Sequence, residues 1–252
     1  MKSSLSIIHK PSPNFSQRRS CPTDILLLHY TGMPSCEDAI GWLCNPESQV
    51  SSHYTITESG EIYQHVDEAM RAQHAGASFW AGESDINSRS IGIEICNPGH
   101  THGYKDFPKK QVAVLADLCR EIIARHNIPP QRVLAHSDVA PERKDDPGEK
   151  FPWKIMAEKG VGLWVKPEPL DRKGGSFSRG DIGAHVGAMQ RMLSVYGYGL
   201  EVSGTFDEKT EAVVKAFQRH FRPKKVDGIA DPSTIATLHK LVMAMPSIQN
   251  GR

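Results

Sequence analysis

The amino-acid sequence predicts an α/β fold in which helices flank a mixed central β-sheet, followed by a second, small domain of three helices. Over residues 1–163, short β-rich apolar runs alternate with helical patterns, which is typical of α/β domains. Beyond residue 180 the pattern becomes helical and repeats itself. The chain has 252 residues, a length that suits two domains of ordinary size.

Short apolar runs in the first part predict the strands. They are "DILLLHY" at 24–30, "SSHYTITESGEIYQHV" at 51–66, "SIGIEIC" at 90–96 and "RVLAHS" at 132–137. The segment "TESGE" between two β-rich runs predicts a hairpin turn, so the sheet should be mixed rather than wholly parallel. The clearest helix is predicted over "KKQVAVLADLCREIIARHN" at 109–127.

Residues 164–180, "WVKPEPLDRKGGSFSRG", have the composition of a linker. They are rich in Pro, Gly, Ser and charged residues and show no apolar period. We therefore predict an N-terminal domain at 1–163, a linker at 164–180 and a helical domain at 181–245. We expect each domain to close a core of its own and to be separable at the linker.

The helical domain contains a short internal repeat. "GTFDEKT" at 204–210 and "GIADPST" at 228–234 share Gly-x-x-Asp-x-x-Thr, and an apolar-periodic helix follows each. Asp207 and Asp231 are suited to cap these helices, and Pro232 occupies a first helical position, where its missing N–H costs nothing. With "VGAMQRMLSVYGY" before them, these segments predict three helices.

Composition excludes several classes of partner. The 30 basic and 29 acidic residues nearly cancel, so the chain lacks the charge expected for binding nucleic acid or an anionic membrane. No run approaches the roughly 20 apolar residues of a membrane helix, so no integral membrane segment is expected. The apolar patch near the N-terminus is shorter than that of a signal peptide. We therefore expect a cytoplasmic protein, with the periplasm or cell envelope as the alternative.

The five cysteines are odd in number and form no C-x-x-C pair. This pattern argues against a disulfide framework and against a structural zinc cluster. Free thiols in a reducing cytosol are the prediction.

Candidate chemistry gathers at three strand ends and one loop. His29 and His136 each end an apolar run, and Glu94 lies inside one, where a carboxylate is rarely buried without a partner. The loop "HSDVAPERKDDPG", whose prolines predict a non-helical segment, adds Lys144 and Asp146. Each residue alone has an ordinary structural explanation, but together they predict a metal hydrolase.

The chemistry of zinc explains why these residue types belong together. A catalytic zinc takes three protein ligands and leaves one position for water. Two imidazoles and a carboxylate fill that role, a second carboxylate can accept the water's proton, and a cation can stabilise an oxyanion. The "HSD" at 136–138 is also a His-x-Asp pattern, and two histidines and a carboxylate bind Fe(II) in oxygenases, but those enzymes need a double-sheet barrel that the helical patterns here do not support.

Taken together, the segments resemble the zinc-dependent N-acetylmuramoyl-L-alanine amidases of the type-2 family, which are related to peptidoglycan recognition proteins. The resemblance covers roughly residues 20–160. It is carried by "LLLHYTG", "SSHYTITESGEIYQHV", "QHAG", "SIGIEICNPG" and "HSDVAPERKDDPG". The C-terminal repeat resembles the type-1 peptidoglycan-binding domain. Two domains that resemble wall-directed families imply one polymer.

The resemblance implies a role for each matching residue. It implies zinc ligation by His29, His136 and Asp146. Glu94 matches the catalytic acid/base and Lys144 the oxyanion stabiliser.

Three further positions match or depart from the family pattern outside this catalytic set. His74 and Asn97 match substrate-binding positions that line the groove, whereas His53 matches a position that supports the sheet. Gln73 departs from the family pattern, in which Trp often precedes His-Ala-Gly.

The function implied is hydrolysis of the amide between the lactyl group of N-acetylmuramic acid and L-alanine, in peptidoglycan or its anhydro-muropeptides, for cell-wall turnover or recycling. The alternative is a non-catalytic peptidoglycan receptor or regulator, whose known examples lack a metal ligand. Polymeric sacculus and muropeptide fragments are both open as the substrate.

Overall fold

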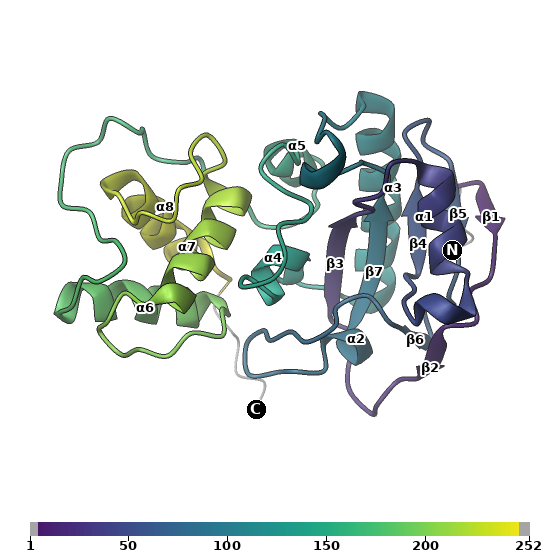
Figure 1. The fold of residues 1–252 in the computed structure, drawn as a ribbon, viewed down its shortest axis with the longest axis horizontal. Coiled ribbons are helices and arrows are strands. Elements are labelled where there is room, and N and C mark those ends of the chain that lie inside the picture. The colour runs from purple at the N-terminus through teal and green to yellow at the C-terminus, as the bar shows by residue number, and fades with distance from the viewer. Residues whose placement is uncertain (1–4, 247–252) are drawn as a thin grey trace.

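A six-stranded mixed sheet forms the centre of the N-terminal part, in the strand order β1-β5-β4-β7-β3-β8 (Figure 1). The computed structural model describes residues 5–246. The prediction that the N-terminal apolar patch is too short for a signal peptide therefore concerns a segment that lies partly outside the described residues. The strands of the sheet are β1 (Ile7–His9), β3 (Ile25–Tyr30), β4 (Tyr54–Ile56), β5 (Ile62–Gln64), β7 (Ser90–Ile95) and β8 (Val133–Ala135). A second, two-stranded sheet pairs β2 (Phe15–Gln17) with β6 (Met70–Ala72).

The sheet is mixed because one pair of neighbours is antiparallel. β4 and β5 form the predicted hairpin around 57–61, whereas β7 pairs in parallel with both β4 and β3. The helices of this part are α1 (Cys36–Leu43), α2 (Ile86–Arg89), α3 (Lys109–His126), α4 (His136–Val139) and α5 (Trp153–Glu158). The predicted α/β class and the long helix at 109–127 are therefore confirmed.

The two faces of β3 pack against different partners. Leu26 and Leu28 belong to the buried cluster that includes α3 residues such as Leu115. Ile25 and Leu27 point to the opposite face and belong to a second cluster. His29 continues this second face, because side chains alternate along a strand.

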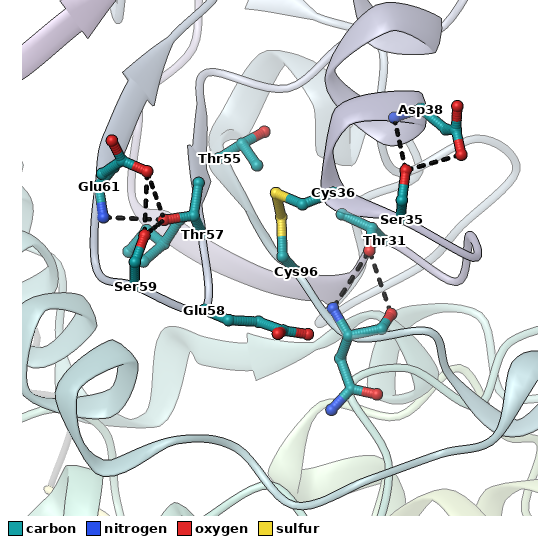
Figure 2. Close-up of a disulfide and its surroundings, with 12 residues drawn as sticks. Thr31, Ser35, Cys36, Asp38, Thr55, Thr57, Glu58, Ser59, Glu61 and Cys96 are labelled. Carbon is teal, nitrogen blue, oxygen red and sulfur yellow. Dashed lines mark hydrogen bonds between the residues drawn. A yellow bond between two sulfur atoms is a disulfide. The ribbon is translucent and has the colours of Figure 1, made fainter.

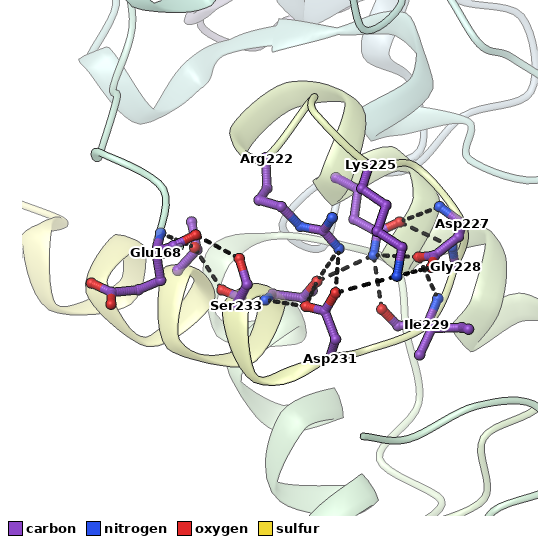
Figure 3. Close-up of polar contacts among 11 residues, drawn as sticks. Glu168, Arg222, Lys225, Asp227, Gly228, Ile229, Asp231 and Ser233 are labelled. Carbon is purple, nitrogen blue, oxygen red and sulfur yellow. Dashed lines mark hydrogen bonds and ion pairs between the residues drawn. The ribbon is translucent and has the colours of Figure 1, made fainter. Parts of the chain in front are cut away.

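The C-terminal part contains the three predicted helices, α6 (Ala184–Tyr196), α7 (Glu208–Phe221) and α8 (Pro232–Ala244). Asp207 and Asp231 cap α7 and α8, each accepting a hydrogen bond from the backbone N–H three residues later, as predicted. Arg222 is buried and donates to Asp231, which fixes the end of α7 against the start of α8 (Figure 3). Ser233 of α8 in turn donates to the carbonyl of Glu168, so this part of the linker is attached to the helices.

The two parts share one of the two hydrophobic clusters, although each part was expected to close a core of its own; the other cluster lies in the N-terminal part. The second cluster contains Ile25 and Leu27 of the sheet together with Phe217 and Phe221 of α7. Trp80 is buried at this junction, with its ring 5.4 Å from that of Tyr196 and 5.0 Å from that of Tyr198, centroid to centroid. The N-terminal part therefore closes one core of its own, but the expectation was wrong for the C-terminal part, whose apolar residues also pack on the sheet. The apolar spacing of a segment does not reveal which distant surface it covers.

Two further expectations need correction. The loop after β8 was expected to be non-helical, but His136–Val139 forms one helical turn, α4. Cys36 and Cys96 were expected to be free, but they form a disulfide that joins the start of α1 to the end of β7 (Figure 2). The pairing links residues 60 positions apart, so local spacing gave no sign of it. Cys21, Cys44 and Cys119 are free, and only Cys119 is buried.

Candidate functional site

Three adjacent strands bring the predicted catalytic residues to one edge of the sheet. β7, β3 and β8 lie side by side, and His29 is paired in register with Glu94. Leu28 pairs with Ala135, so His136 lies one residue beyond the end of β8, next to His29. The prediction that these side chains converge at strand ends is confirmed by this register.

Three ligand atoms form a compact donor set. His29 Nδ1 lies 2.9 Å from His136 Nδ1, and Asp146 Oδ2 lies 3.1 Å from both nitrogens. The second nitrogen of His136 lies 3.1 Å from the Ala75 carbonyl, to which it can only donate, so Nδ1 keeps its lone pair in the neutral ring. Two imidazole nitrogens and one carboxylate oxygen match the donor set of a catalytic zinc site.

The electrostatics of this cluster suit metal ligation. Burial and the neighbouring His136 lower the pKa of His29 to about 4, so its ring is neutral at pH 7. Burial alone would raise the pKa of Asp146, but the two histidines outweigh it and hold this pKa well below its usual range. Ligands must be deprotonated to bind a metal, and both groups meet that requirement.

The two segments that carry His136 and Asp146 are bonded to each other. The Ser137 N–H donates to the Asp146 carbonyl at 3.0 Å. The Asp146–Pro147 peptide bond is cis, and the Tyr104 hydroxyl donates to the Pro147 carbonyl at 2.7 Å. The loop therefore holds Asp146 in a fixed relation to His136.

Glu94 and Lys144 line the cavity that His29, His136 and Asp146 also line, and the volume of this cavity is about 520 Å³. Glu94 Oε2 is buried and has no hydrogen-bond partner among residues 5–246. Burial and the charge of Asp146 raise the pKa of Glu94 well above its usual range, whereas Lys144 opposes the shift. A carboxyl group with a raised pKa and an oxygen without a partner is suited to accept and donate a proton.

The comparisons with known proteins agree with this geometry. Residues 19–149 match the N-acetylmuramoyl-L-alanine amidase family, and residues 183–238 match a peptidoglycan binding domain. The chain belongs to this amidase family. It is an enzyme that hydrolyses an amide bond, built from an amidase domain and a C-terminal domain of the peptidoglycan-binding family.

Several relatives of this amidase are similar over most of their length. The N-acetylmuramoyl-L-alanine amidase AmiD of Escherichia coli is 35% identical over 234 residues, which cover 86% of this chain and 82% of that protein. The structure of AmiD has a TM-score of 0.75 and 32% identity, covering 90% of this chain and 92% of the other. AMPDH3 of Pseudomonas aeruginosa has a TM-score of 0.74 and 30% identity, covering 90% and 95%. Both parts of the chain are thus included in these similarities.

His74 of the amidase contacts His29 and also lines the cavity. Its Nδ1 is 3.0 Å from His29 Nε2, and its Nε2 is 3.3 Å from the Ser90 hydroxyl. Residue 92 is glycine because the His74 ring covers it, and a Cβ there would lie 2.5 Å from Nδ1. His74 was predicted to bind substrate, and the structure adds a contact that orients a metal-ligand candidate.

Asn97 does not line the cavity. It is buried, its Nδ2 donates to the Lys105 carbonyl, and its Oδ1 accepts from the Gly99 N–H. With both polar atoms already bonded, Asn97 braces its loop, and its predicted substrate contact has no support in the structure. His53 accepts a hydrogen bond from the Gly92 N–H, which confirms that it supports the sheet.

Two groups that hold the site together were not predicted from the sequence. Arg143 lines the cavity and donates to the carbonyls of Ala75 and Ala77, which ties the Asp146 loop to the segment after His74. Asp138 is fully buried and contacts residues of the C-terminal part. The only local signal was the "HSD" pattern, which was considered for iron ligation rather than for a structural role.

Proposed function

We propose that the amidase binds one zinc ion through His29, His136 and Asp146. The observation that carries the proposal is the approach of three donor atoms, from two strand ends and one loop, to within 3.1 Å of one another. When bound, zinc lowers the pKa of a water molecule to about 7 and polarises a substrate carbonyl. The remaining steps fall to side chains of this chain.

Glu94 is the proposed general base and acid. Glu94 lines the same cavity as the donor atoms and its Oε2 has no partner among the described residues, so it can accept a proton from the attacking water and deliver it to the departing amide nitrogen. Lys144 lines the cavity from the loop that carries Asp146, and its ammonium group can stabilise the negative charge that develops on the carbonyl oxygen.

The proposed substrate is a muropeptide or peptidoglycan strand, cleaved between the lactyl group of N-acetylmuramic acid and L-alanine. The solved AmiD complex holds anhydro-N-acetylmuramic acid-L-Ala-D-γ-Glu-L-Lys, and a structure of AMPDH3 holds an anhydromuramic pentapeptide. A cavity of about 520 Å³ with Trp42 and Val50 on its wall suits a sugar ring with the first residues of a peptide.

We further propose that the protein works in the periplasm or cell envelope. The Cys36–Cys96 disulfide supports this alternative, because disulfides persist in oxidising compartments and are rare in the cytosol. Among residues 5–246, the helices include none that is long and apolar enough to cross a membrane. Cell fractionation, with mass spectrometry of alkylated cysteines, tests the location; a reduced pair recovered from the cytosol would contradict it.

Two measurements test the proposed activity. Elemental analysis should find about one zinc per chain, and His29→Ala should lose it; full zinc occupancy in that variant would contradict the ligand set. Digestion of intact sacculi and of purified anhydro-muropeptides, side by side and with mass spectrometry of the products, identifies the substrate. A protein that retains zinc and binds sacculi but releases no peptide would instead be a receptor.

A further inference from the structure

Asp138 is a buried carboxylate that lies two residues after His136 and does not line the cavity. Its side chain is 0% exposed, and its Oδ2 accepts a hydrogen bond from the Ala135 N–H at 2.8 Å. Its other two partners come from the C-terminal part: the Tyr198 hydroxyl at 2.6 Å from Oδ1, and His220 Nδ1 at 2.7 Å from Oδ2. A residue in the segment of a metal-ligand candidate is thus held by a different domain.

The neighbouring residue of α7 contacts the other ligand segment. Arg219 forms an ion pair with Asp145, at 2.6 Å between Nη2 and Oδ1, and Asp145 immediately precedes Asp146. Two successive side chains of one helix therefore reach both segments that carry donor atoms, those of His136 and Asp146. The close approach of α4 and α7 can be followed in Figure 1.

The groups that hold Asp138 are themselves fixed. The His220 ring is 1% exposed and lies between the rings of Trp153 and Phe221, with centroids 3.7 and 3.9 Å away. The Tyr198 ring packs on Trp80. Because a buried carboxylate without donors is costly, removal of either partner favours a rearrangement of the turn that begins with His136.

We propose that the C-terminal helical domain positions the metal ligands through Asp138, in addition to binding wall polymer. Asp138 is a positioning residue, and Tyr198 and His220 are its anchors. A domain that only tethers the enzyme raises its local concentration at a surface without changing the site. An anchored ligand segment instead makes metal affinity and turnover depend on the second domain, even for soluble substrates. This inference rests on the proposed zinc site.

The test compares four variants of the full-length chain. Tyr198→Phe removes one hydroxyl, and His220→Phe keeps a stacked ring but removes the donor. His220→Asn restores a donor near the position of Nδ1. Tyr196→Phe is the matched control, because its ring also packs on Trp80 but its hydroxyl is not bonded to Asp138. Zinc affinity is measured by chelator competition, ligand geometry by the absorption spectrum of the cobalt(II) form, and kcat and KM on a soluble muropeptide.

Tyr198→Phe and His220→Phe should bind zinc about 10- to 100-fold more weakly, a loss of the size known for residues that hydrogen-bond a metal ligand directly. Their cobalt spectra should change, and kcat should fall more than KM rises. His220→Asn should recover most of the affinity, and Tyr196→Phe should match the wild type.

The proposal is overturned if both variants keep zinc affinity within twofold of wild type and an unchanged cobalt spectrum, and only their melting temperature is lowered. The contact with Asp138 would then stabilise the fold without positioning the metal ligands. If His220→Phe does not fold, Tyr198→Phe decides alone. Failure of the wild-type chain to bind zinc would overturn the proposed function as well, whereas zinc binding that all variants retain overturns only this inference.

Discussion

Gly92 offers a steric test of how the candidate metal ligands are oriented. A Cβ at this position would lie 2.5 Å from His74 Nδ1. Ordinary van der Waals contact needs roughly 3.5 Å, so in Gly92→Ala the ring must move by about 1 Å. His74 is bonded on both sides, to His29 Nε2 at 3.0 Å and to the Ser90 hydroxyl at 3.3 Å, so a shift of this size breaks at least one of these bonds.

The expected cost of Gly92→Ala has two parts. Overpacking of a well-packed site costs about 1–3 kcal/mol of stability, which lowers Tm by roughly 2–4 °C per kcal/mol for a chain of this size. Loss of the bond that orients His29 should weaken zinc binding by about 10- to 100-fold, with a matching fall in kcat. The two effects are measured separately, by calorimetry and by chelator competition.

Two further variants make this prediction specific. Gly41→Ala is the matched control, because its Cβ meets no atom within 4 Å and it lies inside α1, where alanine should stabilise by up to about 1 kcal/mol. In a His74→Ala background the clash is gone, so Gly92→Ala should add little to the loss. Zinc affinity and kcat within twofold of wild type in Gly92→Ala would refute the role given to His74.

Three other outcomes follow from the site and its surroundings. Glu94→Gln should retain zinc but lose about 10²- to 10⁴-fold in kcat, since the amide cannot accept a proton; near-normal turnover would contradict the role. Lys144→Ala should lose kcat by roughly 10²-fold or more while binding zinc normally. The pKa of Glu68 is lowered from 4.5 to about 2, because hydrogen bonds from His126 and Arg125 outweigh burial, which alone would raise it. Its stabilising contribution is therefore complete above the pKa of the unfolded state and is lost as the pH falls from about 5 to 2. In Glu68→Gln the free energy of unfolding should therefore decrease less steeply over this pH range than in the wild type; an unchanged pH dependence would contradict this.

The parts of the fold that could be predicted from sequence are those indicated by the local spacing of apolar residues. The run "DILLLHY" is buried on both faces, and its consecutive apolar residues predicted a central strand. His29, which follows these apolar residues, was therefore predicted to lie at the edge of the sheet. Parallel register then brought Glu94 beside His29 without any further information. The family resemblance was needed to choose Asp146 over Asp145. The structure agrees with that choice, since Asp145 is half-exposed and paired with Arg219.

Contacts between distant segments could not be predicted in this way. The disulfide depends on α1 and β7 meeting in space, and no spacing rule relates Cys36 to Cys96. Asn97 follows a predicted strand as directly as a ligand would, yet the chain turns its side chain toward the backbone at Lys105 and Gly99. A strand end specifies a position on the sheet edge, but the following loop decides which way the side chain points.

Asp138 shows why the division into two domains was difficult to judge from sequence. Its partners Tyr198 and His220 lie 60 and 82 positions away, on the far side of a segment with the composition of a flexible linker. Linker composition shows only that the connecting chain has no structure of its own, and it carries no information about whether the connected parts touch. Here they share apolar core residues and a buried carboxylate. A chain that ended near Lys166 would leave Asp138 with the Ala135 N–H as its one remaining partner among those described. The loss of the hydrogen bonds from Tyr198 and His220 would destabilise the turn that begins with His136. The linker therefore separates the two parts in sequence, but the site depends on both.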